Sequence, residues 1–398
     1  MSVMAYCFRH ESAHNYVADA PSRLFDGVVS LPGLQILENI GLNAFTNGEA
    51  LFVPVSHFSL LADLSLQCTQ PPEKVIFLLD NKIPPEEPFL GCMRALIDKG
   101  FSFAIENVAD FDRMHPVVEM CEYIKLGFRF NMDNVQLFNK ISRKYRKHVF
   151  IATDVNSIEM YNDLQKTGFY YFEGRFYRLP VPKGPSTISP VKINRIQLLN
   201  TVRQPDFEIE EVVKIVERDP SISISLLKLV NSPHLGISQK IKGIQQAVAL
   251  LGQAEVRKWV TTVIAGLLAD DKPGELTRLA LLRAKFAENM ARHFEMAMQA
   301  NTLFLMGLFS ILDAALNLPM DEALKLIQVD DEVYDVLANQ KGRFMPVLDF
   351  IVAYESADWN TCKNIMAINN IDPGEVFKAY IDTVEWYDVI VSTIIEEE

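Results

Sequence analysis

The sequence has few cysteines, no hydrophobic run long enough for a membrane span, and less positive than negative charge. Its five cysteines among 398 residues are odd in number, widely spaced and without a CxxC pair. This usage excludes a disulfide framework and a zinc ribbon and is typical of a reducing compartment. Apolar runs such as residues 260–269 and 303–309 fall well short of the roughly 20 residues that span a bilayer. With no signal-peptide pattern at the start, we expect a cytoplasmic protein without membrane insertion.

Positive charge is the scarcer sign over the whole chain. The 38 basic and 51 acidic side chains give a formal charge of −13, and residues 191–398 alone hold 20 basic and 30 acidic side chains. Nucleic-acid binders owe their phosphate affinity to cations, so we expect no nucleic-acid partner. One basic cluster occupies residues 140–148. We interpret it as the solvated last turn of a helix, with contact to an anionic ligand or RNA as the alternative.

Length and a proline-rich segment predict two domains. The chain is about two or three times as long as a usual single domain. Residues 180–190 (PVPKGPSTISP) contain four prolines and one glycine. Proline fixes φ and lacks a backbone donor, so this segment suits neither a helix nor a central strand. We predict domains at residues 1–180 and 191–398, joined by a proline-rich linker at residues 181–190.

The two parts differ in their hydrophobic pattern. In the first part, apolar runs of strand length alternate with helical segments, which predicts parallel strands buried on both faces in an α/β layer or barrel. In the second part, apolar residues recur at helical spacing, which predicts an all-helical domain. The predicted strands are residues 50–55, 75–79, 101–105, 123–126 and 149–152; the predicted helices are residues 88–99, 135–147, 157–167, 207–218, 221–230, 244–269, 275–300, 302–316 and 346–354.

One local pattern matches a zinc-protease motif. His10, Glu11 and His14 form HExxH, which on a helix places two imidazoles and a general base on one face. Here the residues before His10 are typical of a strand, and Pro21 soon ends the segment. We interpret the pattern as a turn after the first strand and expect no metal there.

Four segments of the first part follow one another in the order of a known family. Residues 123–127 (YIKLG) are similar to Y-(I/V)-K-(I/L)-D, and residues 150–157 (FIATDVNS) to (V/I)-I-A-E-G-V-E-T. Residues 100–107 (GFSFAIEN) and 168–180 (GFYYFEGRFYRLP) match a strand and the closing segment of the same pattern. The first domain therefore resembles the EAL family of cyclic di-GMP phosphodiesterases, which implies a TIM-like barrel. At about 180 residues against the roughly 250 of such barrels, it would be a trimmed one.

The departures from this family concern its metal ligands. EAL enzymes hold two divalent cations with carboxylate and amide side chains at strand ends. At those positions this chain has Pro54, Phe77, Asp80, Glu106, Asn107, Gly127, Thr153 and Asn156. Lys125 and Glu106 are the retained residues, and one acid cannot anchor two divalent ions. The resemblance thus implies a pseudoenzyme without metal or cofactor, with a candidate vestigial ligand site at Lys125, Glu106 and Glu173.

The second part resembles the HDOD family. Residues 216–233 (VERDPSISISLLKLVNSP) are similar to I-x-x-D-P-x-L-x-x-x-L-L-x-x-x-N-S, and residues 241–252 (IKGIQQAVALLG) to I-x-S-I-x-x-A-I-x-x-L-G. Where HD phosphohydrolases carry a metal-binding His-Asp pair, this chain has Ser310 and Ile311, and His293 lies alone. The loop that begins at Asn231, Ser232 and Pro233 is a candidate docking region, with an ordinary helix-ending turn as the alternative.

Together these resemblances imply a bacterial signalling protein of the EAL-HDOD type that is not an enzyme. We expect it to act as an adaptor that binds a protein partner. A cyclic di-GMP receptor without catalysis stays open as an alternative, and an active phosphodiesterase with relocated ligands is a third. Because the metal ligands are missing, nucleotide binding would depend on Lys125, Glu173, Arg175 and Arg178, which puts it in doubt. The identity of the partner, the pathway and the oligomeric state do not follow from the sequence.

Overall fold

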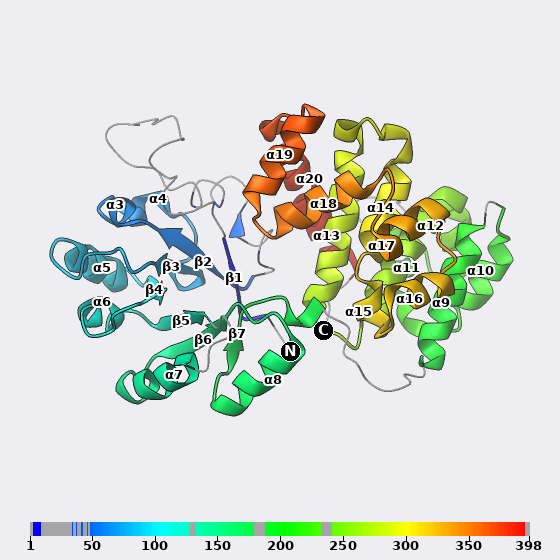
Figure 1. Ribbon diagram of the computed structural model, residues 1–398. Coiled ribbons are helices and arrows are strands. Elements are labelled where there is room, and N and C mark those ends of the chain that lie inside the picture. The colour runs from blue at the N-terminus through cyan, green and yellow to red at the C-terminus, as the bar shows by residue number, and fades with distance from the viewer. Residues whose placement is uncertain are drawn as a thin grey trace. The chain divides into compact units, whose positions relative to one another are not determined.

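The computed structural model describes residues 3–8, 48–127, 133–178, 188–204, 206–231 and 241–394, together with Leu34, Leu37, Gly41, Leu42 and Thr46. The chain forms two compact units, Val3–Phe176 and Tyr177–Glu398. The first contains strands and helices and the second is helical (Figure 1). Each unit is described by itself below.

A parallel sheet of seven strands forms the first unit. Each strand pairs with the next in chain order, and all six pairings are parallel. The sheet curls into a half-barrel (Figure 1). The predicted α/β barrel-like fold is therefore confirmed. The strands are β1 (Ala5–Cys7), β2 (Ala50–Val55), β3 (Val75–Leu79), β4 (Ser102–Glu106), β5 (Tyr123–Gly127), β6 (Val149–Thr153) and β7 (Tyr171–Phe172).

From β2 onward, where the structure describes the connections, helices join successive strands, as parallel pairing requires. α8 shows how the sequence sets their ends: the Ser157 hydroxyl caps it by accepting from the Met160 N–H at 3.1 Å, and Gly168 ends it in the left-handed region at φ 104°. The helices are α3 (His57–Leu60), α4 (Leu64–Gln67), η1 (Pro72–Lys74), α5 (Phe89–Asp98), α6 (His115–Val118), α7 (Asp133–Lys144) and α8 (Ile158–Thr167). Because all seven strands run the same way, their carboxyl ends lie along one edge of the sheet.

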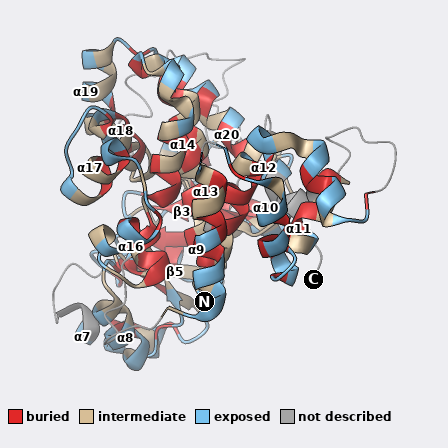
Figure 2. Ribbon diagram, turned by 90° about the vertical axis from the view of Figure 1, so that its right-hand side faces the viewer, coloured by how far each residue is buried: buried red, intermediate tan, exposed pale blue. Residues whose placement is uncertain are grey.

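The second unit is built from helices around one apolar core. Its inner helix faces are buried and its outer faces are exposed (Figure 2). After η2 (Phe176–Arg178), the helices are α9 (Pro190–Arg203), α10 (Ile209–Val216), α11 (Pro220–Val230), α12 (Ile244–Leu268), α13 (Gly274–Met290), η4 (Ala291–Phe294), η5 (Ala297–Gln299), α14 (Ala300–Phe309), α15 (Leu312–Leu316), α16 (Met320–Leu326), α17 (Asp331–Asn339), α18 (Met345–Glu355), α19 (Trp359–Asn369) and α20 (Pro373–Ile394). The predicted all-helical domain is confirmed.

Two of the predicted helices are wrong in their extent. The segment 302–316 is divided into α14 and α15, because Ile311 leaves the helical backbone conformation with φ −119° and ψ 12°. The segment 275–300 ends as an α-helix at Met290, and Glu295 turns the chain with φ 59°. Pro190, assigned to the linker from sequence, is the first residue of α9, where its missing donor is harmless.

Within the described ranges, no helix combines the length and the apolar character that a membrane crossing requires.

Candidate functional site

A buried lysine lies at the carboxyl edge of the parallel sheet. Lys125 comes from β5, where it is in register with Glu106 of β4. Its side chain is 2% exposed, and its Nζ lies 2.8 Å from Glu173 Oε2. The ammonium also lies 4.2 Å from the centre of the Phe52 ring, a cation–π contact. The structure thus brings together the three residues of the candidate vestigial site.

Glu173 is held in place by the neighbouring strand. Its N–H donates to the Ala152 carbonyl at 2.7 Å, and its carbonyl accepts from the Val155 N–H at 3.1 Å. Gly174 follows, and a Cβ there would lie 1.9 Å from the Val155 carbonyl oxygen. Only glycine therefore fits at the position after Glu173. The hydrogen-bonded backbone around Glu173 holds its carboxylate next to Lys125.

Opposing effects act on the charge of Lys125. Burial lowers its pKa, while the nearby Cys7, Glu173 and Glu106 raise it, and the net direction is upward. The pKa of an ordinary lysine is already about 10.4, so the side chain is an ammonium at neutral pH. This site therefore has a fixed cation at its centre.

The arrangement does not fit a pair of divalent cations. Two such ions need several oxygen ligands to balance their charge. The carboxylate of Glu173 is paired with an ammonium, and Gly127 and Thr153 stand where the resemblance implies carboxylates. A Cβ on Gly127 would lie 3.4 Å from Asp154 Oδ2, so an aspartate there would meet a like charge. In the residues that the structure describes, no cluster of three or more His, Cys, Asp or Glu could hold a metal ion.

Two residues, each directly after a strand of the sheet, adopt a left-handed backbone conformation. Asn107 follows β4 with φ 56°, and Asp154 follows β6 with φ 61°. Such conformations are uncommon outside glycine, although Asn and Asp tolerate them best. They let the chain turn sharply at the carboxyl edge, directly beside Glu106 and Thr153.

An arginine network surrounds the positions where HD phosphohydrolases bind metal. The Ser310 hydroxyl accepts from Arg283 Nη1 at 2.9 Å, and Arg283 Nε lies 2.6 Å from Glu355 Oε2. Arg178 forms a second ion pair with Glu355. Ile311 is 5% exposed and belongs to the core. The Glu355 carboxylate is paired with two guanidinium groups, the Ser310 hydroxyl is bound by Arg283, and Ile311 is apolar, so the donor set at this position does not fit a metal either.

Asp313 lies beside this network and is half-buried. Burial raises the pKa of its carboxyl group, and this effect outweighs the opposing contributions of the Ala314 N–H and Arg283. A carboxyl group whose pKa is higher in the folded state costs stability wherever it is ionised, that is, above the folded pKa.

We therefore expect Asp313→Asn to raise the thermal midpoint of the protein at pH 7. The amide can still accept from the Ala314 N–H, which Asp313 Oδ1 now does at 2.8 Å. The gain should shrink as the pH falls through the folded pKa toward the ordinary value of 3.8. Differential scanning calorimetry of both proteins from pH 7.5 down to about pH 3.8, the ordinary carboxyl value, measures this. A gain in the thermal midpoint that does not depend on pH would contradict burial of the carboxylate as its cause. Asp382→Asn, at an exposed position, is the control.

The other residues singled out from sequence are dispersed. His10, His14, Ser232 and Pro233 lie outside the described residues. Asn231 Nδ2 donates to the carbonyls of Leu227 and Ile241 at 2.7 and 2.8 Å, and its Oδ1 accepts from the Ile241 N–H at 2.7 Å. Its side chain thus joins the two ends of the intervening segment.

The remaining cations and the lone histidine each have their own neighbours. Arg175 is exposed, and Arg178 pairs with Glu355 in the helical unit. His293 accepts from Arg292 Nε at 3.0 Å. Burial, followed by the charge of Arg292, lowers the pKa of His293, so this histidine is neutral at pH 7.

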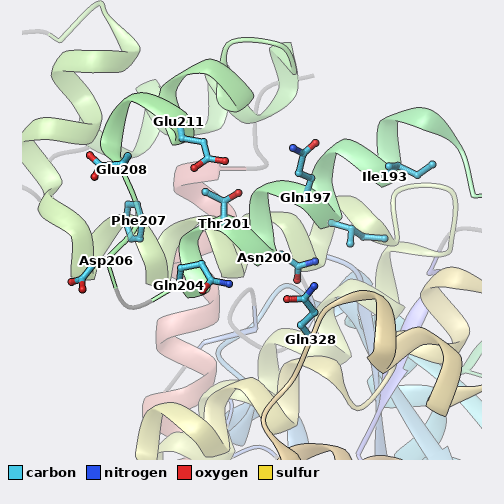
Figure 3. Close-up of a pocket in the computed structure, with 11 residues that line it drawn as sticks. Ile193, Gln197, Asn200, Thr201, Gln204, Asp206, Phe207, Glu208, Glu211 and Gln328 are labelled. Carbon is cyan, nitrogen blue, oxygen red and sulfur yellow. The ribbon is translucent and has the colours of Figure 1, made fainter.

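Sequence analysis did not identify a groove between α9 and α10. It encloses about 600 Å³, within the 300–1,000 Å³ of typical ligand sites. Figure 3 shows polar side chains of α9 along one wall, with Asn200 facing Gln328 and Glu211 pointing toward Thr201. The α9–α10 groove is lined by Ile193, Ile196, Gln197, Asn200, Thr201, Gln204, Asp206, Phe207, Glu208, Glu211 and Gln328. The sequence does contain one indication of this groove, because polar residues recur every three or four positions along α9.

Comparison with known proteins identifies a domain within the second unit. Residues 189–327 match the HDOD domain family. The chain is 27% identical over 359 residues to YuxH of Bacillus subtilis (strain 168), a match covering 87% of this chain and 86% of that protein. It is 26% identical over 357 residues to the cyclic di-GMP phosphodiesterase CdgJ of Vibrio cholerae serotype O1, covering 88% and 82%. The chain carries an HDOD domain over residues 189–327, as predicted.

Among solved structures, the chain is similar to the EAL domain of FimX from Pseudomonas aeruginosa, solved bound to c-di-GMP. The sequence identity is 18%, the TM-score is 0.30, and the match covers 36% of this chain and 66% of that one. The fold of the first unit is established by its own strand order rather than by this overlap.

Proposed function

We propose that the protein is a non-enzymatic signalling adaptor, in which a degenerate EAL-like domain no longer hydrolyses cyclic di-GMP and the HDOD domain binds a protein partner. Its relatives include a protein named as a cyclic di-GMP phosphodiesterase, which links the chain to this branch of signalling. The observation that carries the proposal is the buried ion pair between Lys125 and Glu173, at the edge of the sheet where the resemblance implies metal-bound chemistry.

The chemistry of phosphodiester hydrolysis supports this proposal. Two metal ions activate water and stabilise the leaving oxygen in the EAL mechanism. An ammonium between Glu106 and Glu173 neutralises the carboxylates that such ions would need. The HDOD domain lacks the second possible metal site, since Ser310 and Ile311 replace the His-Asp pair.

We expect the purified full-length protein to form no linear dinucleotide from cyclic di-GMP with Mg²⁺ or Mn²⁺. The measurement is chromatography of the nucleotides over hours, with CdgJ as the positive control. Product released at an enzyme-like rate and abolished in Glu106→Ala would contradict the proposal. Product that persists in Glu106→Ala and stays with the protein through a further purification step would also contradict the proposal, whereas activity that separates from the protein at that step belongs to a contaminating enzyme.

A receptor that binds cyclic di-GMP without hydrolysis is the second candidate, favoured by the name of CdgJ and by the buried cation. Isothermal titration of cyclic di-GMP into the wild-type protein and into Lys125→Met separates the two. Saturable binding that disappears in the variant supports the receptor. No heat of binding with either protein supports the adaptor.

A further inference from the structure

The α9–α10 groove carries three acidic side chains and no basic side chain in its lining. Asp206, Glu208 and Glu211 are all exposed. None of the three side chains forms a hydrogen bond or an ion pair with another residue that the structure describes. Arg257 lies beside the lining: its Nη2 donates to the Gln204 carbonyl at 2.9 Å, and its guanidinium lies 5.6 Å from the centre of the Phe207 ring. The three carboxylates outnumber this one neighbouring guanidinium, so the charge of the groove is negative overall.

The remaining lining combines apolar and amide groups. Ile196 and Phe207 are 7% and 4% exposed and form an apolar floor, while Ile193 is 52% exposed at the rim. Gln197 and Gln204 are exposed on the same wall. Side-chain amides both donate and accept, so they match the N–H and C=O groups of an extended peptide. Such a lining suits a chain segment better than a compact apolar ligand.

The groove is fixed by hydrogen bonds behind its walls. Asn200 Nδ2 donates to the Leu326 carbonyl at 2.9 Å, and Arg203 Nη1 donates to the Ile327 carbonyl at 3.0 Å, which hold the turn carrying Gln328 against α9. Gln253 Nε2 donates to the Phe207 carbonyl at 3.0 Å and fixes the turn before α10. A site that is already formed loses less entropy when a ligand binds.

We propose that the α9–α10 groove binds a short, extended, arginine- or lysine-bearing segment of a partner protein. The three carboxylates would pair with the cationic groups, the apolar floor would contact their aliphatic stems, and the amides would bind the peptide backbone. This inference rests on the proposed adaptor function and names the docking surface and the chemistry of the partner.

The test uses a fluorescein-labelled octapeptide in which arginine alternates with leucine and serine, titrated with the full-length protein. Fluorescence anisotropy should show saturable binding, and the same peptide with glutamate in place of arginine should not bind. The triple variant Asp206→Asn/Glu208→Gln/Glu211→Gln should weaken binding at least tenfold, with a smaller difference at high salt because screening weakens ion pairs. In the wild type, the methyl NMR signals of Ile193 and Ile196 should shift on binding.

A matched variant controls for the change in net charge. Glu255→Gln/Glu322→Gln/Asp382→Asn removes the same three charges from exposed positions outside the groove. Equal weakening in both triple variants, or no binding by the wild type, would overturn the assignment. Spermidine binding with the same affinity and the same dependence on the three carboxylates would also overturn it, by assigning the groove to a small polyamine. None of these results affects the hydrolysis assay, so the proposed function can fail or stand separately.

Discussion

Gly307→Ala should lower the free energy of unfolding of the helical unit by about 3 kcal/mol, at the upper end of the cost of overpacking a core. Gly307 lies in α14 where it crosses α13. A Cβ at this position would lie 2.5 Å from the Arg283 carbonyl oxygen and 2.7 Å from Ala284 Cα. Both atoms belong to the backbone of α13, so no side chain can rotate away, and the two helices must move apart. The buried side chains packed between the two helices then lose contacts along the whole crossing.

The tryptophans make this effect measurable. All three, Trp259, Trp359 and Trp386, lie in the helical unit, so urea unfolding followed by their fluorescence reports this unit alone. Gly274→Ala is the matched control. It lies at the start of α13 with no atom near the added Cβ, and alanine is the better helix former, so stability should rise by about 0.5 kcal/mol. Equal destabilisation by both variants would contradict the argument from close packing.

Regular elements of this fold were predictable from local pattern, and most of the candidate sites were not. β3 is buried over its whole length, and its apolar run predicted a parallel strand with the observed bounds. The break between α14 and α15 is a change of backbone conformation at Ile311, and β7 has only two residues, so neither leaves a periodic signal. Local sequence determines such elements only when many residues share one pattern.

The sites depend on contacts between distant residues. Lys125 and Glu173 are 48 positions apart and meet because β5, β6 and β7 are neighbours in one sheet. The family resemblance pointed to both residues, but their spacing in the sequence could not predict that they form a pair. The α9–α10 groove also needs Gln328, which reaches it only through the hydrogen bonds that Leu326 and Ile327 accept from α9. No local pattern contains that information.

Glu173→Leu should lower the free energy of unfolding of the sheet unit by about 3 kcal/mol, because it removes the carboxylate that the buried Lys125 ammonium contacts directly. Lys125 is 2% exposed, so water cannot take the place of the lost carboxylate. In the variant, the contribution of Glu173 that raises the pKa of Lys125 is gone, while burial still lowers it. A lowered pKa of a buried lysine costs stability while the side chain is charged, so lowering the pH keeps the ammonium and should not relieve the defect.

The double variant Lys125→Met/Glu173→Leu should recover most of this loss, because two apolar side chains of similar size often replace a buried ion pair at little cost. Hydrogen exchange followed by mass spectrometry of peptides from β5 and β6 measures the sheet unit, while the tryptophan transition of the helical unit stays unchanged. Asp163→Leu removes the carboxylate from the exposed pair with Lys166, where both side chains are 76% exposed, and should have no measurable effect. If the double variant were no more stable than Glu173→Leu, the cost would come from the shape of the Glu173 position, and the buried charge of Lys125 would not be its cause.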